Sequence, residues 1–310
     1  MAGETGMSVA LRILIGLVLL GLLLWAFGSA DIGARLRSAE PTWMVAAIAC
    51  LLAQTALMAW RWQLVGRCLG LHFSLGWALR EYLVAQIVNL TVPGGMVGDG
   101  ARAVRSRAGE QGLKRAAQAV VLERAAGQVG LLVVGAAGLG WAVLSPHGLS
   151  LPPDLARGIA VAGLCVVAVG AFAFAFLRRG RIAALVSRCL PTGRIKAAHA
   201  TLSLGAALLN VAAFAACARA VGVVLSPGAA LLIVPLILTA MVIPLGIAGW
   251  GWREGAAAAL FPVAGAAGSA GVAAGILFGV AMMIAAAPGI PLLIRGEKTG
   301  VRDRGRGAPE

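Results

Sequence analysis

Long stretches of this chain carry no charged residue, and this feature limits the possible folds more than any other. Such stretches cover residues 13–30, 41–60, 125–153, 158–177, 197–218, 220–252 and 255–294. A helix needs about 20 largely apolar residues to cross a bilayer, and most of these runs reach that length. Only 12% of the 310 residues are charged, about half of the share that is typical of soluble domains. We therefore expect an all-α, polytopic membrane protein.

The basic residues gather in three segments, at 102–115, 178–196 and 295–306. Connections rich in Arg and Lys stay in the cytoplasm, whereas the connections at 145–157 and 222–226 carry almost no basic residue and belong outside. The net charge of +14 therefore reflects topology and attraction to anionic headgroups, so we expect no nucleic-acid partner. Both termini are expected in the cytoplasm, at a bacterial-type inner membrane. The predicted full spans are 11–28, 42–64, 117–144, 157–177, 199–220 and 270–294.

Two further apolar segments, at about 72–108 and 225–266, must each enter and leave the membrane on one side. Each is a re-entrant pair of half-helices or a spanning hairpin, and the sequence leaves both alternatives open. The second arm of the first segment contains Asp99, Arg102, Arg105 and Arg107, which is too many charges for a helix surrounded by lipid. Irregular backbone at membrane depth is tolerated where it lines a cavity. The segment therefore predicts a cavity.

An internal repeat links these two segments. Residues 93–102 and 244–253 both read P-x-G-x-x-G-x-G-x-R, 151 positions apart, and weaker matches continue upstream with a shift of one residue. The predicted topology orients the two copies oppositely across the membrane. An inverted-topology repeat is typical of alternating-access transporters. We expect one membrane domain over 1–310, with repeat 1 at about 42–144, repeat 2 at about 199–294 and a basic cytoplasmic tail at 295–310.

The two Gly-rich loops are the first candidates for a binding site. Glycines allow turns and the close approach of a ligand, and free N–H groups at the start of a half-helix favour an anion. The alternative is that these glycines serve only helix packing. Candidate substrate-binding residues in and beside the loops are Asn89, Gly94, Gly95, Gly98, Arg102, Gly249, Gly251 and Arg253.

Ionisable residues at membrane depth indicate function, because their burial in lipid is costly. Arg124 joins the candidate anion ligands, while Asp99, Glu123 and Glu254 are expected to pair with the arginines or to couple protons. Alternatively, Glu123 and Arg124 form a structural pair that pins the third span to the first loop. Other polar residues receive structural interpretations: Arg61 and Arg67, with Trp60 and Trp62, as an anchor at the cytoplasmic interface, and Gln54, Gln86, Gln118, Gln128 and Asn210 as interhelical hydrogen-bond partners.

Four stretches resemble one known family: R-W-Q-L-V-G-R-C-L-G-L from Arg61, N-L-T-V-P-G-G-M-V-G-D-G-A-R from Asn89, V-L-E-R from Val121 and I-A-G-W-G-W-R-E-G-A from Ile247. The family is the membrane region of lysylphosphatidylglycerol synthases, and the resemblance covers about 10–295. It implies a polytopic domain of lipid-flippase type. The chain ends about 15 residues after the last predicted span, so we expect a stand-alone member that lacks the soluble synthase domain. The family's site residues would be Pro93, Gly94, Gly95, Gly98, Asp99, Arg102, Glu123, Arg124, Gly249, Gly251, Arg253 and Glu254.

The sequence therefore predicts a flippase or transporter for an anionic or phosphate-bearing lipid: a phospholipid, an aminoacyl-phospholipid or a polyprenyl-linked lipid. The alternatives are a membrane-embedded enzyme acting on a lipid-linked substrate and an accessory subunit of a separate lipid synthase or glycosyltransferase. We expect no enzymatic activity, since no catalytic constellation stands out. We also expect no cofactor and no metal site, because the histidines and cysteines are scattered.

Overall fold

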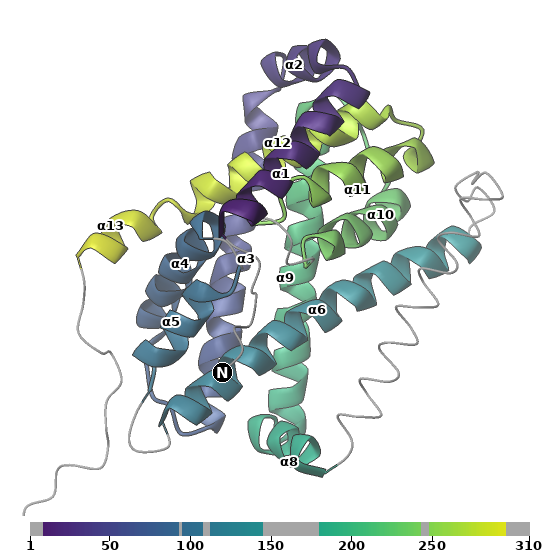
Figure 1. Cartoon of the computed structure of the whole chain (residues 1–310). Helices are drawn as coiled ribbons and strands as arrows, with labels where there is room; N and C mark the ends of the chain where they lie inside the picture. The colour runs from purple at the N-terminus through teal and green to yellow at the C-terminus, as the bar shows by residue number, and fades with distance from the viewer. Residues whose placement is uncertain (1–8, 93–94, 108–111, 145–179, 243–247, 296–310) are drawn as a thin grey trace, which may run out of the picture.

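The computed structural model describes residues 9–92, 95–107, 112–144, 180–242 and 248–295 (Figure 1). In this part of the chain every regular element is a helix, as the sequence predicts. The elements are α1 (Val9–Ala26), α2 (Ser29–Arg37), α3 (Pro41–Cys68), α4 (Leu75–Thr91), α5 (Val97–Arg105), α6 (Gly112–Leu144), α8 (Gly180–Cys189), α9 (Gly193–Ala220), α10 (Pro227–Ala240), α11 (Trp252–Leu260), the 3-10 turn η1 (Phe261–Ala264), α12 (Gly268–Ala286) and α13 (Gly289–Ile294).

Four described helices, α3, α6, α9 and α12, are long and apolar enough to cross a membrane. The helices α1 and α2 meet at a bend of 95° and provide a fifth candidate if they are taken as one broken span. The predicted span 157–177 and the predicted tail beyond residue 295 lie outside the described residues. The last predicted span, 270–294, is corrected: α12 ends at Ala286 and a separate α13 begins after Pro288, because proline interrupts helical hydrogen bonding.

The two predicted re-entrant segments each form a pair of helices. Segment 72–108 contains α4 and α5, and segment 225–266 contains α10 and α11. Both second arms, α5 and α11, have 9 residues, which corresponds to about 13 Å of helix against a hydrocarbon core of about 30 Å. Neither arm is long enough to span the bilayer, which favours the re-entrant alternative.

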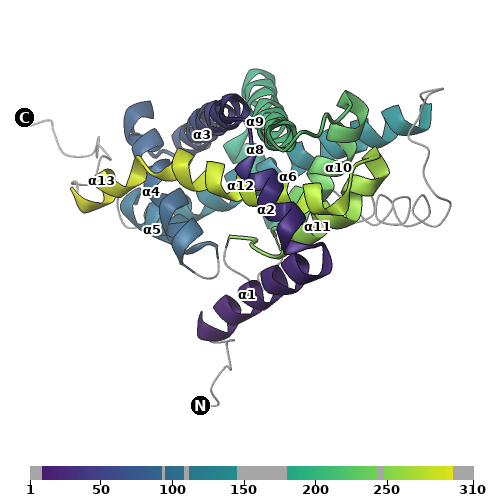
Figure 2. The same ribbon diagram turned by 90° about the horizontal axis from the view of Figure 1, so that it is seen from above.

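Two long helices, α3 and α9, pack side by side and run antiparallel (Figure 1), and Figure 2 shows them together at one edge of the molecule. Helix α3 begins where α9 ends, and the backbone N–H of Glu40 donates to the carbonyl oxygen of Ala220 at 3.0 Å. The α4–α5 pair and the α10–α11 pair lie on opposite sides of these helices in Figure 2. We call α3–α6 the first half and α9–α12 the second half.

The first helix of each hairpin packs against the other half of the molecule. Helix α10 of the second half packs on α6 of the first half, and α4 of the first half packs on α12 and on α13, which follows it. Glycines permit the close approach at both places. An added Cβ at Gly138 of α6 would lie 2.4 Å from the backbone carbon of Leu231, and one at Gly289 would lie 2.5 Å from the carbonyl oxygen of Leu83.

Matching positions of the two halves also adopt the same local geometry. Gly70, which follows α3, has a φ of 80°, and Gly222, which follows α9, has a φ of 82°. Such left-handed residues commonly end helices and favour glycine. Ser74 then caps α4 by accepting from the N–H of Trp77, and Ser226 caps α10 in the same manner. Each pair is separated by 152 positions, the spacing of the upstream sequence matches.

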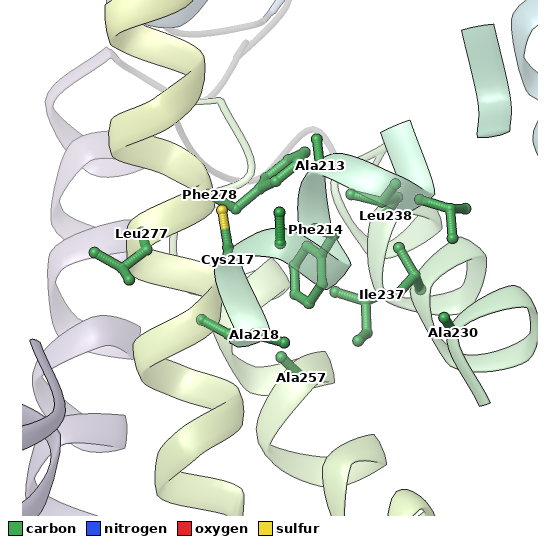
Figure 3. Close-up of a cluster of buried hydrophobic side chains, with 14 of the residues drawn as sticks. Ala213, Phe214, Cys217, Ala218, Ala230, Ile237, Leu238, Ala257, Leu277 and Phe278 are labelled. Carbon is green, nitrogen blue, oxygen red and sulfur yellow. The ribbon is translucent and has the colours of Figure 1, made fainter. Parts of the chain in front are cut away.

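The hydrophobic cores of the two halves differ in character. In the second half, side chains of α9, α10 and α12 gather around Phe214 (Figure 3), whose ring centroid lies 5.2 Å from that of Phe278. In the first half, the rings of Trp62, Phe73 and Trp77 pack together with centroid distances between 4.6 and 5.8 Å. The aromatic cluster of the first half borders the buried charges that form the candidate site.

Candidate functional site

A cavity of about 480 Å³ lies between the two halves, within the size range of small-molecule sites. Helices α3, α4 and α6 of the first half line it together with α9, α10 and α12 of the second half. The ends of both Gly-rich loops reach it, through Gly95 and Met96 on one side and Ala248 and Gly249 on the other. The cavity predicted from segment 72–108 is therefore present. Gly94 lies outside the described residues.

The cavity-lining residues of the two halves correspond to one another in sequence. Helix α3 corresponds to α9, and α4 to α10, at a constant spacing of 152 positions, and members of both sets line the cavity. The lining pairs are Leu51 and Ser203, Gln54 and Ala206, Thr55 and Ala207, Met58 and Asn210, Gln86 and Leu238, Asn89 and Met241, and Leu90 and Val242. Both halves thus present the same positions to one space.

Chemically, the two sides of the cavity are different. Helices α4 and α6 contribute Gln86, Asn89, Arg124 and Gln128. Helix α12 and the end of α10, with the two residues that follow α10, contribute only apolar side chains from the described residues: Leu238, Met241, Val242, Phe278, Met282 and Ala285. The cavity therefore has a mostly polar side at α4 and α6 and an apolar side at α10 and α12, which we call the polar wall and the apolar wall. Helices α3 and α9 contribute a mixed lining, with Gln54 and Asn210 beside Leu51 and Met58.

Ion pairs adjoin the polar wall, and three of their members, Arg61, Asp99 and Arg124, themselves line the cavity. Glu123 of α6 accepts from Arg61 of α3 at 2.5 Å and from Arg102 of α5 at 3.2 Å. Asp99 of α5 accepts from Arg102 at 3.0 Å and from Arg124 of α6 at 2.6 Å. All four carboxylate oxygens of Glu123 and Asp99 are engaged by guanidinium groups. These contacts tie three helices of the first half together, and we call the five residues the charge cluster.

Arg102 occupies the most enclosed position of the charge cluster. Its side chain is fully buried, and its guanidinium carbon lies 4.5 Å from the ring centroid of Trp62 and 4.2 Å from that of Tyr82. Aromatic faces attract a desolvated cation. They hold a guanidinium group whose Nε and Nη1 atoms have no hydrogen-bond partner. Arg102 is not among the residues that line the cavity, so its role as a direct substrate ligand stays a prediction.

Asn89 connects the first loop to the charge cluster. Its side-chain oxygen accepts from the backbone N–H of Gly98 at 2.8 Å, and its amide nitrogen donates to Asp99 at 3.2 Å. The first turn of α5 is thereby attached to the last turns of α4. Gly98 is needed here because α5 touches the α4 backbone: an added Cβ would lie 2.2 Å from the carbonyl oxygen of Ala85.

Arg124 has the most exposed side chain of the charge cluster, and it lines the cavity. Its side chain keeps 37% of its exposed area, whereas the side chains of Arg61 and Arg102 keep 1% or less. One terminal nitrogen pairs with Asp99, and the side chain lines the cavity. Glu123 and Arg124 are adjacent in sequence, but each pairs with residues on other helices. This geometry corresponds to the structural alternative in which α6 is pinned to the first loop.

The second loop carries a separate pair of charges. Arg253 donates through Nε to Glu254 at 3.0 Å, and its guanidinium group also lies near Trp250 and Phe278. Glu254 in turn accepts from the backbone N–H of Gly251 at 2.7 Å and so stabilises the start of α11. Both charged side chains are buried, and neither lines the cavity. The predicted set of three arginines and three acids therefore divides into two groups.

One structural interpretation from the sequence is wrong, and a second is confirmed for Gln86 but not for its neighbours in the cavity. Arg61 and Trp62 do not anchor the chain at the membrane interface: both are buried, and Arg61 pairs with Glu123 and donates to Ser203 at 3.0 Å. Trp60 and Arg67 are exposed, as an anchor requires. Four carboxamides also do more than join helices, because Gln54, Gln86, Gln128 and Asn210 line the cavity. Only Gln86 among them makes an interhelical hydrogen bond, with Thr55.

Comparison with known proteins identifies the family. The model of the family described as "Lysylphosphatidylglycerol synthase TM region" matches residues 9–289. The match includes both Gly-rich loops, the charge cluster and every residue that lines the cavity. The resemblance seen in the sequence is therefore confirmed. No curated protein matches the chain.

Proposed function

We propose a function on the premise that this chain belongs to the lysylphosphatidylglycerol synthase TM region family: it moves an anionic or phosphate-bearing lipid between the leaflets of the membrane. Family membership and the long apolar helices make it a multi-pass membrane protein tied to lipid metabolism or translocation. The finer proposal rests on the geometry of the cavity.

The observation that carries the proposal is the division of the cavity into a polar and an apolar wall. A lipid has the same division, with a polar headgroup joined to apolar tails. The headgroup would lie against α4 and α6, beside Arg124, and the tails against α10 and α12. The start of α5, at Met96, lines the cavity and adds positive potential there.

Movement between leaflets requires a site that can open to either side, and an inverted repeat provides one. Three observations support such a repeat. The helices α3 and α9 are antiparallel, each hairpin packs on a long helix of the other half, and the cavity is lined by corresponding positions of both halves. We place the site on the pseudo-two-fold axis, with both termini in the cytoplasm of a bacterial-type inner membrane.

Within this site Arg124 would contact the substrate anion directly, and Arg61, which also lines the cavity, would add positive charge to the site. Asp99 and Glu123 hold the arginines in place. Because their carboxylate oxygens already accept from guanidinium groups, we favour transport over chemical conversion of a lipid. Arg253 and Glu254 would stabilise the second loop rather than bind substrate.

Replacement of Arg124 by glutamine tests this proposal. Purified protein is reconstituted in vesicles with a phosphatidylglycerol that carries a fluorophore on one acyl chain, and dithionite quenching measures the flip rate. We expect Arg124→Gln to lower the rate by about tenfold or more, since a hydrogen bond to a charged group contributes about 1.5–3 kcal/mol. The control is Arg67→Gln, at an exposed position near the end of α3.

The same preparation separates the alternatives. An unchanged rate in Arg124→Gln would contradict the assignment of the anion site. A new lipid product in the vesicles, detected by mass spectrometry, would favour the enzyme. Flipping that requires a separate lipid synthase or glycosyltransferase would favour the accessory subunit.

A further inference from the structure

Three carboxamide side chains face the cavity with unused hydrogen-bonding groups. Gln54 of α3, Gln128 of α6 and Asn210 of α9 line the cavity, and none of them has a hydrogen-bond partner within the described residues. Their neighbours differ, because Gln86 is bonded to Thr55 at 3.1 Å and Asn89 is bonded to Gly98 and Asp99. The three free groups come from three helices and line the same cavity as Arg124.

The position of Gln128 relates these groups to the anion site. It follows Arg124 by four residues on the same helix, so the two side chains lie one above the other on one face. A ligand whose phosphate contacts Arg124 therefore presents the adjoining part of its headgroup to Gln128. Gln54 and Asn210 line the same cavity from α3 and α9.

The chemistry of a carboxamide selects its partners. It offers one acceptor oxygen and two N–H donors, and a hydroxyl group both donates and accepts. An ammonium group only donates, and a nearby carboxylate with free oxygens would favour its binding in a buried site. Asp99 is the one carboxylate that lines the cavity in the described part of the chain, and both of its oxygens are bonded to arginine.

The balance of charge favours one negative charge on the ligand. The charge cluster contains three guanidinium groups, those of Arg61, Arg102 and Arg124, against two carboxylates. The charge cluster therefore has a net charge of +1, and we assign this charge to Arg124, the most exposed of the three arginines. A singly charged phosphodiester would neutralise it, whereas a cationic headgroup would be repelled by it.

We propose that the headgroup carried in this cavity is a phosphodiester that bears hydroxyl groups and no amine, such as a glycerol or sugar phosphodiester. Arg124 binds the phosphate, and Gln54, Gln128 and Asn210 select the hydroxyl groups. This inference rests on the proposed lipid transport and names its substrate class. It also excludes an aminoacylated headgroup as the preferred ligand of this chain.

Three lipid probes with identical labelled acyl chains test the proposal in vesicles. Phosphatidylglycerol has one negative charge and two hydroxyl groups, phosphatidylpropanol has the charge alone, and phosphatidylethanolamine has an amine. We expect wild-type protein to flip phosphatidylglycerol about tenfold faster than phosphatidylpropanol, which corresponds to about one or two hydrogen bonds. Phosphatidylethanolamine should move no faster than in protein-free vesicles.

Replacing the three carboxamides together, as Gln54→Leu, Gln128→Leu and Asn210→Leu, should lower the phosphatidylglycerol rate to that of phosphatidylpropanol. Circular dichroism and size-exclusion chromatography show whether the variant is folded, and the ratio of the two flip rates is the readout. The matched control is Gln118→Leu, also on α6 but outside the cavity lining. If the triple variant does not fold, the three single variants are compared by the ratio of the two rates.

The outcomes separate this inference from the proposed function. Equal rates for phosphatidylglycerol and phosphatidylpropanol in wild-type protein, or faster movement of phosphatidylethanolamine, would overturn the substrate class and leave lipid transport standing. If no probe moves faster than in protein-free vesicles, lipid transport fails, and the substrate class fails with it.

Discussion

Replacement of Glu123 by glutamine (Glu123→Gln) is expected to lower the free energy of unfolding by about 3–5 kcal/mol, the usual cost of breaking a buried ion pair. The Glu123 side chain is fully buried and accepts from both Arg61 and Arg102. Glutamine has nearly the same shape, so the change leaves no cavity. It removes the negative charge between two buried guanidinium groups, and transport should be lost together with stability.

Thermal unfolding in detergent, followed by circular dichroism, measures this effect. The control is Glu40→Gln, because Glu40 is exposed at the start of α3 and its side chain makes no capping hydrogen bond. A second change, Arg61→Met, should restore part of the stability lost in Glu123→Gln by removing one uncompensated charge. A melting temperature of Glu123→Gln equal to that of Glu40→Gln would contradict the structural role of the charge cluster.

Much of the fold could be predicted because its signals are local. The apolar runs identified α3, α6, α9 and α12, and the Gly-rich motifs identified the return points between α4 and α5 and between α10 and α11. Helix ends were harder. Pro288 divides the last predicted span, although its position in a long apolar run gave no sign of whether the helix would continue beyond it.

The candidate site was harder to predict from the sequence, because the partners in an ion pair can be far apart along the chain. Arg61 follows a run of apolar residues, and the sequence therefore placed it at the membrane interface. In the structure α3 continues to Cys68, so Arg61 lies within the helix, and its partner Glu123 is 62 residues away. Conversely, the adjacent positions of Glu123 and Arg124 suggested an ion pair between them, whereas each pairs with residues of other helices. Sequence could indicate which charges are unusual but not how they are partnered.

The carboxamides are a second case in which the sequence did not indicate what a polar side chain contacts. Gln54 and Gln86 occupy membrane depth, where an interhelical hydrogen bond is the common role of such residues. Only Gln86 has that role, with Thr55, while Gln54 faces the cavity. The repeat contained a usable signal: the positions 152 residues after Gln54 and Gln86 hold Ala206 and Leu238. Other lining pairs, such as Met58 and Asn210, are polar in the second copy instead, so the repeat indicates an asymmetric lining without assigning its polar side.

Gly98→Ala is expected to have the second large effect, because α5 packs directly on the backbone of α4 at this residue. The added Cβ would lie 2.2 Å from the carbonyl oxygen of Ala85, a contact that only a shift of α5 can relieve. Overpacking of this kind costs about 1–3 kcal/mol or more. The shift would also lengthen the hydrogen bond from the Gly98 N–H to Asn89 and displace Asp99 from Arg124. The flip rate should therefore fall by more than the loss of folded protein alone would cause.

Gly100→Ala provides the matched comparison on the same helix, because nothing lies within 4 Å of a Cβ at Gly100. Alanine favours a helix over glycine by up to about 1 kcal/mol, so Gly100→Ala should be as stable as wild-type protein or slightly more stable. The two variants thus predict opposite signs for one chemical change, two residues apart. Thermal unfolding and the phosphatidylglycerol flip rate are measured for both. Similar melting temperatures and flip rates in the two variants would mean that the approach of α5 to α4 does not hold the charge cluster in place.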